Sequence, residues 1–492
     1  MPSEEQVLEF LSAAERGQTR FSNATGYDCV MGEGRRRSPS GVNRSEDQEL
    51  TPYNRWQLYE AGRNLARNSS AVGFAIRKHL DYVSKFTFQN KTTGEGAERF
   101  GALLHEWSKP ENCDVAGRHS FLKMIRLAER SRTVDGDLLI VKIADGRLQM
   151  IEGDKIRTPP GGFPAAVPYK PFDFLHGVQT DAAGRSLNYA VCRRARASDY
   201  ALASGMFYFE RMVPSDACWH HGYFDRFDQI RGVSPLAGSY NVFRDVYEGC
   251  DYALAKMKVV QLCGLLTKRE SDQPLGTVTP QQPLQPLLPG SVQIYDDAPQ
   301  PSGFSVDFGR GPFHIDLNKD DDAKFIGSDQ PGTSMQEFVA NMLELALKGL
   351  DIPFSFFREN YTNYSGQRQG WIQYSQSAEM KRADNIDLMD AIIRWRTGLW
   401  IEDNELPGAV EDYAWEWVPT GAPWIDPLKE VQADTAAVAG GFYSRTRVCR
   451  EMGLDFEEVA REIAHENELL EELGLTTTMN PANVQITEVT SG

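Results

Sequence analysis

The pattern of this sequence changes at one stretch, residues 226–236, which read RFDQIRGVSPL. Ser234 followed by Pro235 is a typical helix start, because serine caps free N–H groups and proline fits the first turn. Apolar residues then recur at helical spacing, and the next proline is Pro274. We therefore expect a helix from Ser234 to about residue 268, roughly 50 Å long at 1.5 Å per residue. Such a helix is long for a compact globular domain.

The residues before this helix are expected to form helices first and strands afterwards. Apolar spacing of three and four predicts helices, and alternation around Gly-containing turns predicts two β-hairpins. The helical stretches are 51–90, 94–107 and 118–132, and the hairpins are 136–143 with 148–151 and 175–179 with 188–193. Residues 1–50 are rich in Ser, Gly, Arg and Glu, and we expect a flexible arm there.

The residues after the helix alternate between a proline-rich segment and further helices. Five prolines fall between 274 and 289, and strand patterns follow at 291–295 and 304–308. Ser334 is expected to cap a helix that ends at Ile352-Pro353. The remaining expected elements are helices over 367–403, 427–439 and 455–472 and a strand at Trp415 and Trp417. The sequence as a whole predicts an α+β fold.

Composition limits the function classes. The chain has 492 residues, a net charge of −17 and 41% apolar residues, which suits two to four folded units. An acidic protein does not grip nucleic acid over its whole surface, although it can still handle DNA without gripping it. Seven widely spaced cysteines argue against disulfides and zinc sites and favour a reducing compartment. The longest apolar run, 259–266, is too short to cross a membrane, and the first residues lack a signal-peptide pattern.

No common catalytic motif is present in the sequence. His220-His221 has no carboxylate or cysteine at metal-ligand spacing, so a structural or surface role is favoured. Asp135-Gly136-Asp137 is most simply interpreted as a turn before a hairpin. Asp320-Asp321-Asp322 lacks the spacing and glycine of a calcium loop, and a solvated acidic loop is favoured over a cation site. We therefore expect no catalytic residue, no metal and no cofactor.

Four further features occur together in one order. They are RFDQIRGVSPL at 226–236, NYSGQR at 363–368, WIDPLKEVQA at 424–433, and Gly441, Ser444 and Arg445 followed by EMGLDFEEV at 451–459. From about residue 50 to 473 the chain resembles the lambda-type portal proteins of tailed bacteriophages. Their patterns are R-x-x-Q-x-R-G-V-S-x-L, N-Y-S-S-x-R, W-V-D-P-x-K-E-x-Q-A and G-x-x-S-R…E-x-G-x-D-x-E-E-V. Gly366 stands where the second pattern has its second serine.

The resemblance implies a portal fold. In this fold a helical and partly β-rich wing precedes two long stem helices that flank a small β-containing clip, and a long helix leads to a helical C-terminal crown. The implied divisions are the arm 1–50, the wing 51–233, stem helix 234–270, the clip 271–333, stem helix 334–350, a tunnel loop 351–365, a long helix 366–403 and the crown 404–492.

The resemblance also implies a function. Portal proteins form a ring, usually dodecameric, at a unique capsid vertex, and viral double-stranded DNA is packaged and ejected through its channel. The implied partners are further copies of the chain, the terminase large subunit, the major capsid protein and a head–tail connector or adaptor. No membrane is expected, and the implied location is the virion after assembly in the host cytoplasm. Twelve copies would carry a charge on the order of −200, so DNA would slide past the walls and not stick.

Channel residues follow from the same resemblance. The candidates are Arg358, Asn360, Tyr361, Asn363, Tyr364, Ser365 and Arg368 around the tunnel loop, with Lys256 and Lys258 on the stem. The aromatic residues at 354–364 would form a base-stacking platform, or a packed loop between two helices. Two other functions stay open: a virion connector or scaffold without a channel, and a metal-dependent nuclease at Asp320–Asp322.

Overall fold

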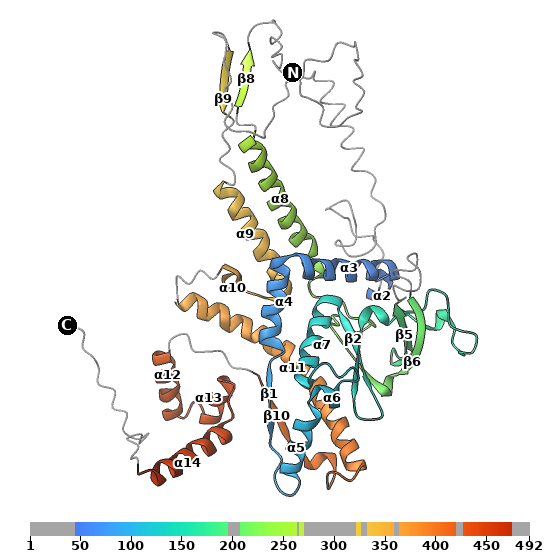
Figure 1. Cartoon of the computed structure of the whole chain (residues 1–492), viewed down its shortest axis with the longest axis vertical. Coiled ribbons are helices and arrows are strands. Elements are labelled where there is room, and N and C mark those ends of the chain that lie inside the picture. Colours follow the sequence, from blue (N-terminus) through green and yellow to red (C-terminus); the bar gives the residue numbers. More distant parts are fainter. Residues whose placement is uncertain are drawn as a thin grey trace, which may run out of the picture. The chain divides into compact units, whose positions relative to one another are not determined.

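The computed structural model describes residues 45–194, 207–262, 265–269, 321–325, 332–358, 364–419 and 427–474 (Figure 1). The chain divides into two compact units. One comprises residues 1–244 and 342–492, and the other residues 245–341. The described residues combine helices with small antiparallel sheets, as the α+β prediction requires.

The first unit begins with helices. They are α2 (Glu46–Glu49), α3 (Pro52–Asn68), α4 (Ser70–Val83), α5 (Ala97–Trp107), α6 (Pro110–Cys113) and α7 (Phe121–Asp135). The helical stretch expected over 51–90 is split at Ser69, whose hydroxyl accepts a hydrogen bond from Val72 N and caps α4. The expectation is wrong at its end, because residues 86–90 form a strand. The end of the expected flexible arm forms α2 instead, because the buried Asp47 carboxylate accepts hydrogen bonds from Ile230 N.

Three antiparallel sheets belong to this unit. Their strand orders are β1 (Phe86–Asn90) with β10 (Trp415–Pro419); β3 (Leu148–Glu152), β2 (Asp137–Lys142) and β7 (Cys218–Gly222); and β4 (Val178–Thr180), β5 (Ser186–Arg194) and β6 (Phe207–Pro214). Both predicted hairpins are confirmed, β2 with β3 and β4 with β5. The strand expected at Trp415 and Trp417 is also confirmed, and it pairs with a segment more than 300 residues earlier in the chain.

The 39-residue helix α11 (Tyr364–Glu402) runs through the core of the first unit. Its buried residues Met389, Ile392 and Trp400 pack in one cluster with Phe100 of α5 and Ile125 of α7. The indole N–H groups of Trp415 and Trp417 both donate to Asp390 Oδ1, at 2.7 and 3.0 Å. These contacts attach the β1–β10 sheet to α11.

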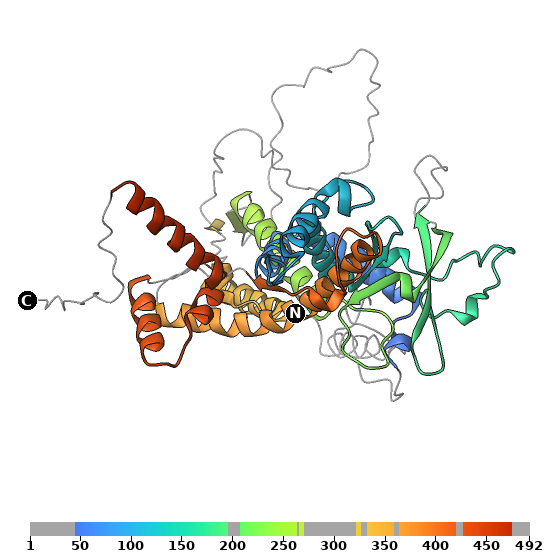
Figure 2. The same ribbon diagram turned by 90° about the horizontal axis from the view of Figure 1, so that it is seen from below.

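Three C-terminal helices follow, α12 (Pro427–Ala439), α13 (Arg445–Glu451) and α14 (Phe456–Glu472), the red helices of Figure 2. The helices predicted over 427–439 and 455–472 are confirmed, whereas α13 was not predicted. An ion pair of 2.5 Å joins Lys91 Nζ to Asp455 Oδ2, and another of 2.8 Å joins Arg450 to Glu416.

The second unit contains most of α8 (Tyr240–Leu262) and α9 (Thr333–Leu347), with β8 (Leu265–Arg269) paired to β9 (Asp321–Phe325). A Cβ on Gly249 would lie 3.8 Å from Met335 Cε, so α8 and α9 meet at these residues. The prediction that one helix runs from Ser234 to about residue 268 is wrong at both ends. The expected strands at 291–295 and 304–308 lie outside the described residues.

Short helical pieces complete the first unit. The 3-10 turns are η2 (Gly153–Lys155), η3 (Pro171–Asp173), η4 (Ser215–Ala217), η5 (Ala237–Ser239), η6 (Lys348–Leu350) and η7 (Val410–Asp412), and α10 spans Phe354–Arg358.

Candidate functional site

A buried ion pair joins strand β2 to the segment that precedes α8. Arg231 donates from Nε to Asp137 Oδ2 at 2.6 Å and from Nη2 to Asp137 Oδ1 at 2.7 Å, and neither side chain is exposed. Arg231 also donates to the carbonyl oxygens of Ile156 at 2.6 Å and Gly153 at 2.8 Å. This arginine therefore joins β2, η2 and the segment before α8.

The electrostatics of the pair favour the charged forms of both groups. Burial alone would raise the pKa of Asp137, but the charge and hydrogen bonds of Arg231 outweigh burial and hold that pKa well below its usual range. Burial likewise would lower the pKa of Arg231, and Asp137 reverses the effect. His220 Nε2 lies 3.0 Å from Asp137 Oδ2, which gives this histidine the structural role expected from the sequence.

Two glycines let the backbones approach closely beside this pair. Gly136 ends α7 with a φ of 102°, and a Cβ there would lie 2.5 Å from Gly232 O. A Cβ on Gly232 would lie 2.4 Å from Gly136 O. Residues 135–137 therefore do form a turn, as expected, but their two carboxylates are also buried ion-pair partners, since Asp135 pairs with Arg63 at 2.6 Å.

Ser234 explains why α8 begins later than expected. Its hydroxyl donates to Thr133 O at 2.6 Å, at the end of α7, and accepts from Leu236 N at 3.2 Å. Tyr240 Oη then donates to Val134 O at 3.2 Å. Because Ser234 is tied to α7, the chain makes the 3-10 turn η5 first, and the α-helix starts at Tyr240.

A second buried polar cluster fixes the long helix α11. Glu129 of α7 accepts from Arg132 Nε and from Asn385 Nδ2, each at 2.9 Å, and its Oε1 lies 2.7 Å from His79 Nε2. Burial would raise the pKa of Glu129, but the adjacent Arg132 charge holds it well below its usual range. Arg132 also donates to Asp384 at 2.8 Å. The cluster joins α4, α7 and α11.

Four of the predicted channel residues lie at the end of α10 or in the first turns of α11. Arg358 ends α10, is exposed, and lies 5.2 Å from the centre of the Phe354 ring. Arg368 Nη1 contacts Glu430 Oε1 of α12 at 2.8 Å, so the two arginines have different partners. Tyr364 and Ser365 are the first residues of α11, and Lys256 and Lys258 lie on α8. The other candidates, Asn360, Tyr361 and Asn363, lie outside the described residues.

The described aromatic residues before α11 are packed. Phe356 stacks on Tyr82 with ring centres 5.9 Å apart and meets Tyr374 edge-on at 5.6 Å. Phe357 contacts Phe74 edge-on at 5.5 Å. For these rings the packed-loop interpretation is confirmed. For Tyr361 and Tyr364 the base-stacking role stays a prediction.

Within the described ranges no group of three or more His, Cys, Asp or Glu residues is placed to hold a metal ion. Asp321 and Asp322 begin β9, whereas Asp320 lies outside those ranges. Among the described helices none is both long and apolar enough to cross a membrane.

The sequence interpretation missed the roles of the buried charges. Arg231 was part of the quoted stretch, yet its partner Asp137 was assigned only to a turn. His79 and Glu129 offered a signal, because each occupies a helical position between apolar residues that are buried. A charged residue at such a position needs a buried partner.

Comparison with known proteins gives the family. The model of the phage portal protein, lambda family, matches residues 33–382. No curated protein matches the chain.

Three solved structures are similar to the chain. The virion of a native gene transfer agent particle matches with 12% identity and a TM-score of 0.45, over 82% of this chain and 94% of that chain. The neck of an empty gene transfer agent particle, computed with C6 symmetry, matches with 13% identity and a TM-score of 0.45, over 84% of this chain and 96% of that chain. The neck of a native gene transfer agent particle, computed with C12 symmetry, matches with 11% identity and a TM-score of 0.44, over 82% of this chain and 94% of that chain. Because the family model spans more than half of the 492 residues, the chain belongs to the lambda family of phage portal proteins.

Proposed function

We propose that twelve copies of this chain close into a ring at one capsid vertex and that viral double-stranded DNA is packaged and ejected through the ring. The family match over residues 33–382 carries the proposal. In this function the chain acts as a conduit and a docking platform, without catalysis.

The exposed faces of the second unit support a ring. Tyr252 of α8 is 73% exposed and Phe338 of α9 is 59% exposed, and Tyr247 is also exposed. Exposed aromatic side chains on two helices that meet, as α8 and α9 do, offer an apolar contact surface to a neighbouring copy. A face of this kind that meets a different face of the next copy produces a closed ring when the rotation between copies closes.

The divisions inferred from the sequence give each segment a task in the proposed ring. Residues 271–333 form the clip that receives the terminase large subunit during packaging and a head–tail connector or adaptor afterwards. Residues 51–233 form the wing next to the major capsid protein. Residues 234–270 and 334–350 line the stem, and the candidates from Arg358 to Arg368 surround the constriction.

The charge of the chain suits passage of DNA. At −17 per copy the ring is strongly acidic and repels phosphates, so a duplex moves without being held. A few cations, Lys256 and Lys258 among them, then make weak local contacts.

The ring is tested by its assembly state. Mass photometry and negative-stain microscopy of the purified full chain should show rings with a central opening. Tyr252→Ser should shift the population toward monomers, because it removes an exposed aromatic ring that only a neighbour would bury. Tyr53→Ser is the matched control, since Tyr53 is 63% exposed but lies on α3 in the first unit, and it should leave rings intact.

Two outcomes would contradict the proposal. A monomer under all conditions would remove the ring. Rings without an opening would favour the alternative, a virion connector or scaffold that conducts no DNA.

A further inference from the structure

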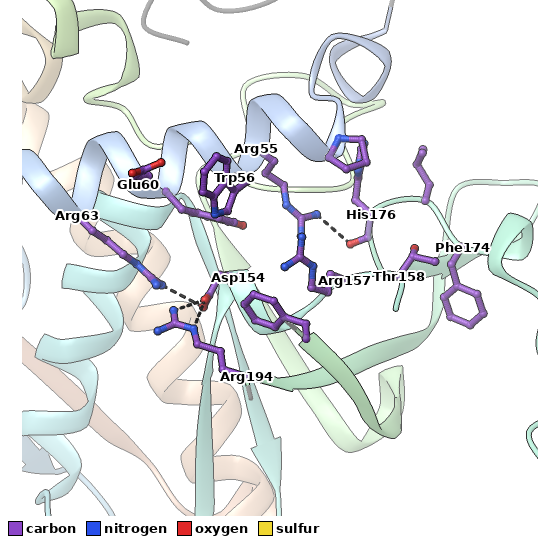
Figure 3. A pocket seen from close by; sticks show the side chains of 14 residues that line it. Arg55, Trp56, Glu60, Arg63, Asp154, Arg157, Thr158, Phe174, His176 and Arg194 are labelled. Carbon is purple, nitrogen blue, oxygen red and sulfur yellow. Dashed lines mark hydrogen bonds and ion pairs between the residues drawn. The ribbon is translucent and has the colours of Figure 1, made fainter. Parts of the chain in front are cut away.

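A pocket opens between α3 and the sheet that contains β5 and β6. Its volume is about 490 Å³. Four arginines line it, Arg55 and Arg63 from α3, Arg157, and Arg194 at the end of β5 (Figure 3). Trp56 and Phe207 add aromatic walls. On a chain with a net charge of −17, a pocket lined by four arginines is unexpected and points to an acidic ligand.

Arg55 lines the pocket and is a buried cation whose hydrogen-bond partners carry no charge. Arg55 is buried, and it donates to two carbonyl oxygens, Ile156 O at 2.6 Å and His176 O at 3.0 Å. Neither partner carries a negative charge. The nearby carboxylate of Asp137 is already bound by Arg231. Burial, followed by the repulsion of Arg231, lowers the pKa of Arg55 to about 10.

Arg157 is a second lining cation and is half-buried. Its guanidinium carbon lies 4.2 Å from the centre of the Phe207 ring, and within the described part of the chain its guanidinium has no hydrogen bond or ion pair. Figure 3 shows its side chain next to that of Arg55. Arg63 and Arg194 differ, because both bind the carboxylate of Asp154. The pocket thus holds two cations without a carboxylate of their own.

We propose that this pocket binds a single acidic side chain, an aspartate or glutamate flanked by apolar residues, on a segment of a partner protein. One further carboxylate would extend the pattern of the site, in which Asp137 binds Arg231, Asp135 and Asp154 bind Arg63, and Asp154 also binds Arg194. Charge-assisted contacts to arginine are among the stronger hydrogen bonds in proteins. Trp56 and Phe207 would cover the neighbouring apolar side chains.

The lining of the pocket disfavours nucleic acid as the ligand. Glu60 and Asp154 line the same walls as the arginines. They would repel the successive phosphates of a nucleic-acid strand, whereas a single carboxylate can avoid them. The proposal does not depend on ring formation.

The test uses two peptides and the full chain. A rhodamine-labelled peptide with the core Phe-Glu-Phe is titrated with the protein, and fluorescence polarisation reports binding. The control peptide carries Phe-Gln-Phe. We expect saturable binding of the glutamate peptide and about tenfold weaker binding of the glutamine peptide, the loss typical of one charged hydrogen bond. Equal binding of both peptides would overturn the proposal without any variant.

Variants then place the peptide. Arg157→Gln should weaken binding of the glutamate peptide about tenfold, and Arg157→Lys should restore part of it. Arg185→Gln makes the same charge change at an exposed residue between β4 and β5, and it should leave the affinity unchanged. Equal losses in Arg157→Gln and Arg185→Gln would show a general charge effect and contradict the site.

Competition separates carboxylate from phosphate. Acetate should displace the peptide at least as well as inorganic phosphate at the same ionic strength. If phosphate or deoxyadenosine monophosphate displaces the peptide and acetate does not, the pocket is a phosphate site and the proposal is wrong.

Discussion

At the scale of single residues, the strongest structural requirement is that each buried charge has its partner. Removing one member of a buried pair leaves an uncompensated charge, which costs about 3–5 kcal/mol. Asp137→Asn would leave Arg231 buried among carbonyl groups. We expect this variant to unfold at lower urea concentration, with a loss of that order in the free energy of unfolding. Asp145→Asn breaks an exposed pair with Arg147 and should cost less than about 1 kcal/mol.

Buried histidines predict how stability depends on pH. Burial lowers the pKa of both His176 and His221 to about 4, whereas an unfolded histidine titrates near 6.5. The unfolded chain therefore takes up protons first as the pH falls from 6.5 to about 4, and the folded state loses stability in that window. Each histidine should lower the free energy of unfolding by about 2 kcal/mol as the pH falls from 7 to 5.

The histidine contribution is measured by comparison with a variant. His176→Gln should flatten the decline of the unfolding free energy between pH 7 and pH 5. The Asp137 carboxyl group affects stability in a different pH range. Because its pKa in the folded protein lies below 3.8, its contribution to the unfolding free energy is lost only below that pH. Burial raises the pKa of Asp47 above 3.8, so this group acts in the opposite direction. An unchanged slope in His176→Gln would contradict the assignment.

The sequence could not predict which buried charges pair. Asp137 and Arg231 are 94 residues apart, and only the packing of β2 against the segment before α8 brings them together. Locally, Asp135-Gly136-Asp137 has the composition of a turn, and a turn is present. The ion pairs come from tertiary contacts that local composition does not report.

At the scale of elements, helices whose ends are set locally were predicted well. The helix over 427–439 begins at Pro427 in both the prediction and the structure. At Ser234 the same reasoning places the helix start too early, because the hydroxyl bonds both Thr133 O and Leu236 N, and a 3-10 turn precedes α8, which begins at Tyr240. Around Ser69 the apolar spacing continues through a break, because that one serine ends α3 and caps α4.

A comparison of two glycines tests the contact between elements. Gly136 and Gly117 both have positive φ, 102° and 64°, and an alanine at either position is strained by about 1–2 kcal/mol. Only at Gly136 would the new Cβ also meet backbone, 2.5 Å from Gly232 O, while nothing lies within 4 Å at Gly117. Gly136→Ala should therefore lower the thermal midpoint clearly more than Gly117→Ala. Equal shifts would mean that residue 232 moves aside freely.

At the scale of the whole molecule, periodicity identifies an apolar stripe but not its partner. The spacing along α8 predicts a helix with an apolar face, yet Leu254 on that face is exposed and Phe243 is buried. Apolar residues at one helical spacing on α8 are therefore buried at one position and exposed at another. Periodicity alone does not say what covers that surface, and the proposed ring assigns it to a second copy of the chain.

The constriction of the proposed ring gives the last prediction. Replacing both Tyr361 and Tyr364 with alanine should leave rings intact in negative-stain images and reduce the amount of packaged DNA, because the loop would lose two hydroxyl groups that can contact phosphates of the passing duplex. Packaging is measured as nuclease-protected DNA with terminase and capsids present. Tyr53→Ala, which changes an exposed side chain of α3, is the control and should package normally. If the double variant fails to form rings, the loop supports assembly and the constriction must be sought elsewhere.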